Sequence, residues 1–174
     1  MRNLKRIFII FLTIVILLPS VPITVSATTY SGTCGDNLTW TMNMESKTLV
    51  ISGTGPMKQW GTGGHPWDEY TIHIEKLVIE EGVTTITAGS FFGNSWLKSV
   101  KLPNTLTRIG DEAFSRSGIT SISIPGSVTY ISYFVFRGCE SLSSVSLGSG
   151  IETIKEGAFT DCHMQEPSRP LTNL

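Results

Sequence analysis

A short pattern of apolar and polar positions recurs through the middle of the chain. In residues 97–103, the apolar Val100 and Leu102 alternate with the polar Ser99 and Lys101. Apolar residues that alternate with polar ones predict a strand with one buried face. Each copy is therefore expected to form one short strand. The copies recur at a spacing of 22 or 23 positions, and the others occupy 74–80, 119–125 and 142–148.

The rest of each copy keeps its apolar positions in phase. In the copy that begins at Leu97, a second extended segment is predicted over 106–109, followed by a helical or 3₁₀ turn that points Phe114 inward. The other copies have equivalent phenylalanines, at Phe91, Phe136 and Phe159. The second unit is one residue shorter, through a deletion around residues 116–118. The four units are 74–96, 97–118, 119–141 and 142–162.

No unit can bury its apolar side alone, so the units are expected to stack as coils of a repeat solenoid. Stacking places equivalent residues in ladders about 4.8 Å apart. The expected fold class is β-dominated, with short parallel strands joined by short helical or 3₁₀ turns. The phenylalanine ladder should dominate its stability, because burial of each such side chain is worth about 1.5–3 kcal/mol.

The segments on either side of the repeats follow other patterns. Leu38, Trp40 and Met42 alternate with polar residues, and the alternation resumes after a turn, which predicts a β-hairpin over 38–52. Residues 28–73 are therefore interpreted as an N-terminal cap that covers the first coil. The segment from Gly53 to Gly64 is rich in glycine, which predicts a loop. Residues 163–174 are polar, contain two prolines and predict an irregular tail.

The repeat resembles the BspA-type leucine-rich repeat of bacterial surface proteins. The shared pattern is apolar-x-x-Ile/Val-x-Ile/Leu-Pro, then Val-x-x-Ile, then Phe-x-x-Cys, and Cys139 and Cys162 stand where that family often has cysteine. Residues 31–40 and 49–57 are similar to the N-terminal cap of such proteins. The resemblance implies a binding module for protein partners, acting in cell-surface adhesion or in contact with host extracellular or cell-surface proteins.

Residues 1–27 have the composition of a secretory signal peptide. Arg2, Lys5 and Arg6 precede an unbroken apolar run over residues 7–18, and small residues stand before a cleavage site after Ala27. The apolar run is shorter than the roughly 18–20 residues needed to span a bilayer. The chain is therefore expected to be secreted or held at the cell surface, with no membrane span once the signal is removed.

Charge and cysteine content narrow the function further. After residue 27 the chain is weakly acidic and has no basic run, which argues against nucleic acid as a partner. The three cysteines, Cys34, Cys139 and Cys162, cannot all pair within the chain. Cys139 and Cys162 stand one repeat apart, and two buried thiols are favoured over a disulfide because parallel side chains hold their Cβ atoms too far apart.

Candidate catalytic or metal-binding residues are few. His65, Asp68, Glu69, His73 and Glu75 lie close together in the sequence, but their spacing matches no zinc motif. The alternative, a loop that packs Trp67 onto the first coil, is favoured. The exposed pairs Asp111–Glu112 and Glu152/Glu156 are interpreted as surface charge. No nucleophile motif or phosphate loop is recognisable, so the chain is expected to have no enzymatic activity, cofactor or resident metal.

The outward positions of the predicted strands are the main candidates for partner binding, and aromatic residues form a second set. The candidates are Lys76, Val78, Ser99, Lys101, Ser121, Ser123, Ser144, Ser146, Trp60, Trp67 and Trp96. Two alternatives stay open: a carbohydrate-binding module that uses the cap aromatics, and a truncated remnant of a longer surface protein. The last unit should also expose strand edge and apolar residues, which predicts self-association through this C-terminal coil.

Overall fold

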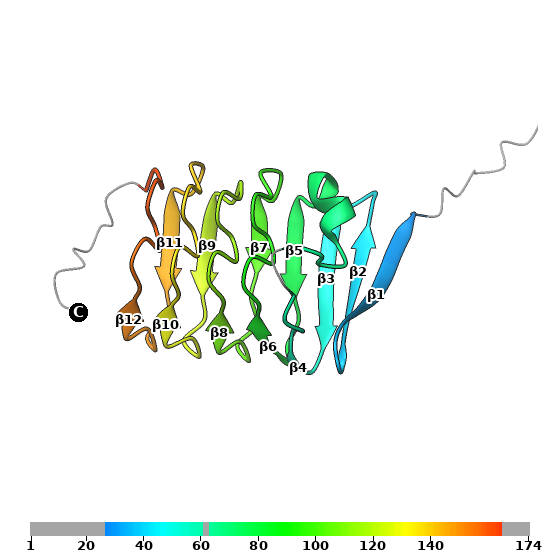
Figure 1. The fold of residues 1–174 in the computed structure, drawn as a ribbon, viewed down its shortest axis with the longest axis horizontal. Helices are drawn as coiled ribbons and strands as arrows, with labels where there is room; N and C mark the ends of the chain where they lie inside the picture. The colour runs from blue at the N-terminus through cyan, green and yellow to red at the C-terminus, as the bar shows by residue number, and fades with distance from the viewer. Residues whose placement is uncertain (1–26, 61–62, 165–174) are drawn as a thin grey trace, which may run out of the picture.

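The computed structural model describes residues 27–60 and 63–164, in which strands dominate (Figure 1). The expected signal peptide, except for Ala27, and all but the first two residues of the expected tail lie outside this range. The elements in chain order are β1 (Thr29–Gly35), β2 (Leu38–Asn43), β3 (Thr48–Gly53), β4 (Gly55–Pro56), the 3₁₀ helix η1 (Asp68–His73), β5 (Lys76–Ile79), β6 (Val83–Ile86), β7 (Ser99–Lys101), β8 (Arg108–Ile109), β9 (Ser121–Ile124), β10 (Tyr130–Ile131), β11 (Ser144–Leu147) and β12 (Thr153–Ile154).

The first strand of each repeat lies parallel to its counterpart in a neighbouring repeat. In the β5–β7 pair, Leu77 lies opposite Val100, and in the β9–β11 pair Ile122 lies opposite Val145. Both pairs join residues 23 positions apart. The spacing of the repeats in the sequence therefore sets the register in which these strands pair.

The second strand of each repeat forms another row along the molecule (Figure 1). β4, β6 and β8 form one parallel sheet and β10 pairs with β12. In these pairs Ile86 lies opposite Ile109, and Ile131 opposite Ile154. Within the segment predicted as extended over 106–109, residues 108–109 form the short strand β8.

The segment around each phenylalanine is a hydrogen-bonded turn, as predicted, and it also pairs from one repeat to the next without forming a regular helix. The Phe91 and Phe114 N–H groups donate to the carbonyl oxygens of Ala113 and Val135, at 2.8 and 3.0 Å. Two positions in each unit have left-handed φ angles, which a right-handed helix cannot contain. These positions are Gly89, Glu112, Phe134 and Gly157, and Gly93, Arg116, Gly138 and Asp161.

An antiparallel meander precedes the repeats. The hairpin predicted over 38–52 is present, with Trp40 of β2 opposite Ile51 of β3. The sequence did not reveal β1, which pairs antiparallel with β2, nor the parallel pairing of β3 with β5, in which Leu49 lies opposite Leu77. The five strands β1-β2-β3-β5-β7 therefore form one sheet, and β4 lies within the segment predicted as a loop.

The core is a continuous file of apolar side chains with stacked aromatic rings at one side. The rings of Phe91, Phe114, Phe136 and Phe159 are stacked with centroids 5.4, 5.8 and 5.2 Å apart. Phe114 and Phe136 are completely buried. We call this set the phenylalanine ladder.

The one-residue deletion in the second unit interrupts the strand pairing. The five-stranded sheet ends at β7, and β9 pairs only with β11 in the described part of the chain, although β7 and β9 lie side by side. Gly118 lies at this point, and its N–H donates to the Asn94 carbonyl at 3.0 Å. A Cβ atom at Gly118 would overlap the Ser95 carbonyl oxygen, so only glycine fits this close approach of two backbones.

Candidate binding surfaces

The outward side chains of β5, β7, β9 and β11 form one surface, which we call the strand face. Ladder register places Lys76 beside Ser99 and Val78 beside Lys101 in one block. In the other block Ser121 lies beside Ser144, and Ser123 beside Ser146. Seven of the eight predicted positions are exposed and Val78 is half-buried. The structure thus gathers the predicted strand positions on one side of the molecule.

The strand face is small in side-chain size and rich in hydroxyl groups. A shallow groove of about 430 Å³ runs across β7, β9 and β11. Ser99, Ser121 and Ser144 lie along it, and Lys98 lies at its margin. Such a surface can accept a complementary chain by hydrogen bonding, but it lacks the Tyr, Trp and Arg side chains that usually dominate binding energy at interfaces.

The three candidate tryptophans occupy different environments. Trp96 is 53% exposed on the turn that ends the first repeat. Trp67 is only 1% exposed: its ring stacks on Phe91 and its Nε1–H donates to the Ser90 carbonyl at 2.9 Å. The Trp67 indole is therefore out of reach of a partner. This agrees with the interpretation that the loop packs Trp67 onto the first coil. Trp60 is half-buried and lines a pocket.

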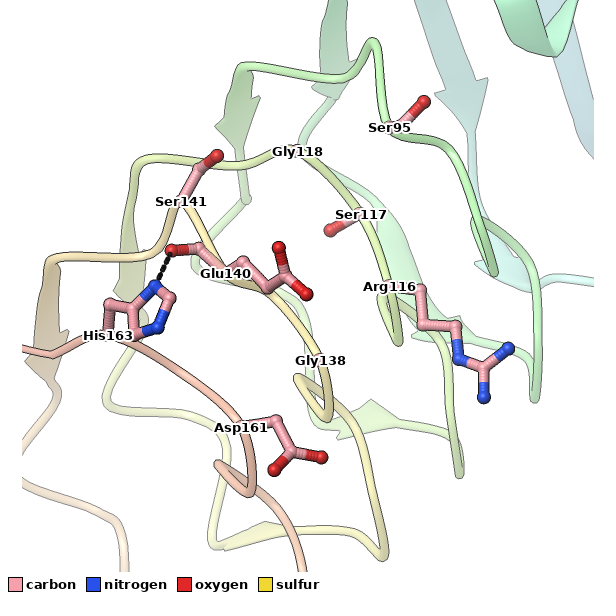
Figure 2. A pocket seen from close by; sticks show the side chains of 9 residues that line it. All are labelled: Ser95, Arg116, Ser117, Gly118, Gly138, Glu140, Ser141, Asp161 and His163. Carbon is pink, nitrogen blue, oxygen red and sulfur yellow. Dashed lines mark hydrogen bonds between the residues drawn. The ribbon is translucent and has the colours of Figure 1, made fainter.

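A polar pocket of about 750 Å³ lies where the second unit is shortened (Figure 2). The His163 side chain closes one side, with Nδ1 2.9 Å from the Glu140 carbonyl oxygen. Figure 2 shows the Arg116 side chain directed away from the carboxylates of Glu140 and Asp161. The buried Ser117 hydroxyl is 3.4 Å from the Cys139 sulfur. The lining groups are thus engaged within the protein or exposed to solvent, and they define no particular ligand.

A second pocket, with a volume of about 750 Å³, lies between the loop before η1 and the turns of the first two repeats. We call it the aromatic pocket. Its walls include Trp60 and Phe92, and the latter is 45% exposed. The remaining lining residues are Gly63, His65, Asp68, Thr71, Ala88, Gly89, Asp111 and Glu112. Aromatic surface and carboxylates therefore face the same space.

His65 is the buried polar residue of this pocket. Its side chain is 3% exposed, and its Nδ1 lies 3.5 Å from Asp68 Oδ1. Asp68 is fixed by the backbone N–H groups of Gly64 and His65, which donate to Oδ2 at 2.8 and 2.9 Å. Burial lowers the pKa of His65, and the nearby Asp68 carboxylate opposes that shift. The imidazole is consequently neutral at pH 7.

The cysteines are buried thiols. None of the three is in a disulfide, and all three lie in the described part of the chain. Burial raises the pKa of Cys34 and of Cys162 to about 11, and raises that of Cys139 against a hydrogen bond from Ser117. Asn94, Ser117, Cys139 and Cys162 occupy equivalent places at the end of the four units, so the cysteine position of the repeat holds polar residues in the first two. These thiols are unsuited to nucleophilic chemistry at neutral pH.

Residues 27–60 and 63–164 contain neither a metal-binding cluster nor a membrane-spanning helix. No group of three or more His, Cys, Asp or Glu side chains there is placed to hold a metal ion. His65 and Asp68 do meet, but His73 and Glu75 do not join them in such a group. No helix in this part of the chain is long and apolar enough to cross a membrane.

Sequence reasoning did not identify the aromatic pocket. Asp111 and Glu112 were interpreted as surface charge, and stacking of the second unit on the first brings them beside His65 and Asp68. The Gly89 N–H, for example, donates to the Asp111 carbonyl at 3.0 Å. One signal was available: the first unit alone has a second phenylalanine, Phe92, directly after its ladder position.

Comparisons with known proteins agree with this architecture. A family model described as the BspA type leucine-rich repeat region, with six copies, matches residues 69–173. A leucine-rich repeat protein from Eubacterium ventriosum superimposes with a TM-score of 0.64 at 19% identity, over 80% of this chain and 45% of that one. A T. pallidum leucine-rich repeat protein gives 0.52 at 24% identity, over 71% and 64%. No curated protein sequence matches the chain significantly.

The two structural likenesses show the fold alone, and the chain spans less than half the length of the Eubacterium ventriosum protein. The family match covers more than half of the chain, including every repeat read from the sequence. The strand-dominated architecture of the chain is of the leucine-rich-repeat type. The chain belongs to the BspA-type leucine-rich repeat family.

Proposed function

We propose that the chain is an exported, non-catalytic binding module whose strand face contacts a protein partner. Leucine-rich repeat proteins generally bind proteins, and the BspA-type family is one of bacterial surface proteins. In this proposal residues 1–27 direct export, residues 28–73 cap a solenoid, and residues 74–162 form its four coils. The partner is a host extracellular or cell-surface protein, and binding serves adhesion.

The observation that carries the proposal is the uncovered strand face. Its side chains extend over four strands in two registered blocks, and no other described segment packs over them. A partner can contact all of these exposed side chains at once. The three lysines Lys76, Lys98 and Lys101 at one end favour a partner with acidic residues opposite them.

Binding to immobilised extracellular-matrix proteins tests the proposal. Ser121→Arg places a long charged side chain in the groove of the strand face, where Ser121 is exposed. Thr129→Arg adds the same side chain at an exposed position just before β10, in the other row of strands, and serves as the control. We expect saturable binding that free sugar does not displace, that Ser121→Arg weakens at least about tenfold and that Thr129→Arg leaves unchanged.

Two results would count against the proposal. Equal binding by both variants would place the contact elsewhere on the molecule. Turnover of a hydrolase substrate by the purified protein would replace binding by catalysis as the function.

A further inference from the structure

The aromatic pocket has the charge of a cation-binding site. Its three carboxylates, Asp68, Asp111 and Glu112, are exposed around a space of about 750 Å³, and no Lys or Arg is among its described lining residues. Carboxylates that line one space make its electrostatic potential negative, which favours a positively charged ligand. A negatively charged ligand is correspondingly disfavoured.

These carboxylates are not arranged as the ligands of a metal ion. They do not form a group that could hold a metal, in the part of the chain that the structure describes. An ammonium or guanidinium group differs from a metal ion in that its charge is spread over several N–H donors. Such a group can use separated carboxylates without bringing them to one point.

The aromatic walls already attract the protein's own cations. Lys58 Nζ lies 5.0 Å from the centroid of the Trp60 ring, and Arg116 Cζ lies 5.7 Å from that of Phe92. Both distances are within the range of cation–π attraction. The rings at two sides of the pocket therefore have the geometry in which a further basic side chain can be held.

Two residues that line the pocket each contain a buried nitrogen atom without a hydrogen-bond partner. Among the described residues, His65 Nε2 and Trp60 Nε1 have no hydrogen-bond partner. Asp68 Oδ1 lies 3.5 Å from Nδ1 and accounts for that ring nitrogen, whereas Nε2 is buried without a partner. Trp60 Nε1 is a donor and suits a peptide carbonyl. Buried groups of this kind cost free energy until a partner completes them.

We propose that the aromatic pocket binds a Lys or Arg side chain of a protein partner, with Asp111 and Glu112 facing its charge and Trp60 and Phe92 flanking its stem. This inference rests on the proposed function, since it supplies a second contact for the same kind of partner. The pocket lies on the turn side of the first two repeats, away from the strand face. A partner that reaches both surfaces must wrap around the N-terminal part of the repeats.

Short peptides test the pocket without knowledge of the natural partner. The purified chain is titrated with blocked Gly-Gly-Arg-Gly-Gly and Gly-Gly-Lys-Gly-Gly, and with the Gln peptide of the same length. Calorimetry measures affinity, and tryptophan fluorescence, to which Trp60 contributes together with the three other tryptophans, follows binding. We expect saturable binding of the Arg and Lys peptides that weakens with added salt, and no binding of the Gln peptide.

Matched double variants locate the binding. D111N/E112Q removes two charges from the pocket while keeping side-chain size, and E152Q/E156Q removes two exposed charges from the fourth repeat. D111N/E112Q should weaken Arg-peptide binding about five- to tenfold at low salt, and E152Q/E156Q should leave it unchanged. Thermal melts check that both variants remain folded, which their exposed positions favour.

Several outcomes would overturn the inference. These are equal affinity for the Arg and Gln peptides, an equal loss in the two double variants, and a fluorescence change produced by neutral sugars that D111N/E112Q does not alter. The last result would identify a carbohydrate site. Failure of the pocket is distinct from failure of the proposed function: partner binding that is sensitive to Ser121→Arg can persist without peptide binding, and peptide binding can occur without any matrix partner.

Discussion

The indole ring of Trp67 stacks on the phenyl ring of Phe91, with their centroids 5.5 Å apart and their planes inclined by 11°. Trp67 lies outside the repeats, yet it continues the phenylalanine ladder by one rung towards the N-terminus. His65 stacks on the other side of Trp67, at 5.7 Å. The segment before the first repeat therefore joins the core of the repeats, and one end of the ladder opens into the aromatic pocket through Trp60.

Removal of a central rung should destabilise the whole chain. Phe114 is fully buried between Phe91 and Phe136, so Phe114→Ala leaves a cavity between neighbouring repeats. We expect a loss of about 3–5 kcal/mol in the free energy of unfolding. Urea unfolding measures it, with Tyr133→Ala, at a 46% exposed aromatic residue, as the control with little effect. An unchanged unfolding curve for Phe114→Ala would contradict the ladder.

Two glycine substitutions should differ in cost for separate physical reasons. Gly89 has a φ of +66° and open space where a Cβ would lie, so Gly89→Ala adds backbone strain of about 1 kcal/mol and little else. Gly118 has no such φ, but its Cβ would overlap the Ser95 carbonyl. Gly118→Ala should therefore cost about 3 kcal/mol or more, since two backbones must separate. Equal unfolding free energies for the two variants would show that the shortened unit is not closely packed.

The thiols should be protected in the folded protein. Cys34 and Cys139 are buried, Cys162 is half-buried, and burial raises the pKa of all three. A disulfide-exchange reagent at neutral pH should react slowly with the native protein and then titrate three thiols after denaturation. Fewer than three thiols in the denatured, unreduced protein would indicate a disulfide that the structure does not contain.

The sequence predicted the repeats well because their signal is periodic. Seven apolar positions recur in each unit, and the register of β5 with β7 and of β9 with β11 follows directly from the spacing. β1 gave no such signal, since Cys34 is its only buried residue and the strand carries no apolar alternation. The parallel pairing of β3 with β5 was equally hidden, because Leu49 and Leu77 lie farther apart in the sequence than one repeat length.

The left-handed positions of the turns and the aromatic pocket were missed for a different reason. Left-handed residues interrupt each turn, and four of them are not glycine, so composition did not mark them: Glu112, Arg116, Phe134 and Asp161. The pocket combines residues from the loop before η1 with residues of two turns. Its acidic rim depends on three-dimensional stacking, which places Asp111 beside the segment that contains Asp68.

The last repeat should promote self-association. Leu147, Ile154 and Phe159 are half-buried, whereas their counterparts in the third repeat are buried. Partly exposed apolar side chains favour contact between copies, and so does the edge of β11 that pairs with no strand of the described residues. We expect a sedimentation coefficient that rises with concentration, and a weaker rise for Ser146→Lys because edge charge opposes strand pairing. A concentration-independent monomer would rule this contact out.

His65 should make stability depend on pH in the weakly acidic range. Burial is the main cause that lowers its pKa below the ordinary value of 6.5, and the Asp68 carboxylate and the Ala88 carbonyl oppose it without reversing it. The unfolded chain therefore binds a proton at this residue more readily than the folded chain does. The stabilisation that the neutral His65 contributes is complete above pH 6.5. It is lost as the pH falls from 6.5 to the lowered pKa of His65 in the folded state. Below that pKa this residue causes no further loss. The slope cannot exceed about 1.4 kcal/mol per pH unit for one proton.

Urea unfolding across this range measures the effect, with His65→Gln and His73→Gln compared with the unchanged protein. His73 is exposed, so its substitution should leave the slope as it is. His65→Gln should lower stability at neutral pH, because the stacked imidazole is lost, and should flatten the curve below pH 6.5. If the two variants and the unchanged protein gave parallel curves, His65 would not be the buried neutral imidazole on which the chemistry of the aromatic pocket depends.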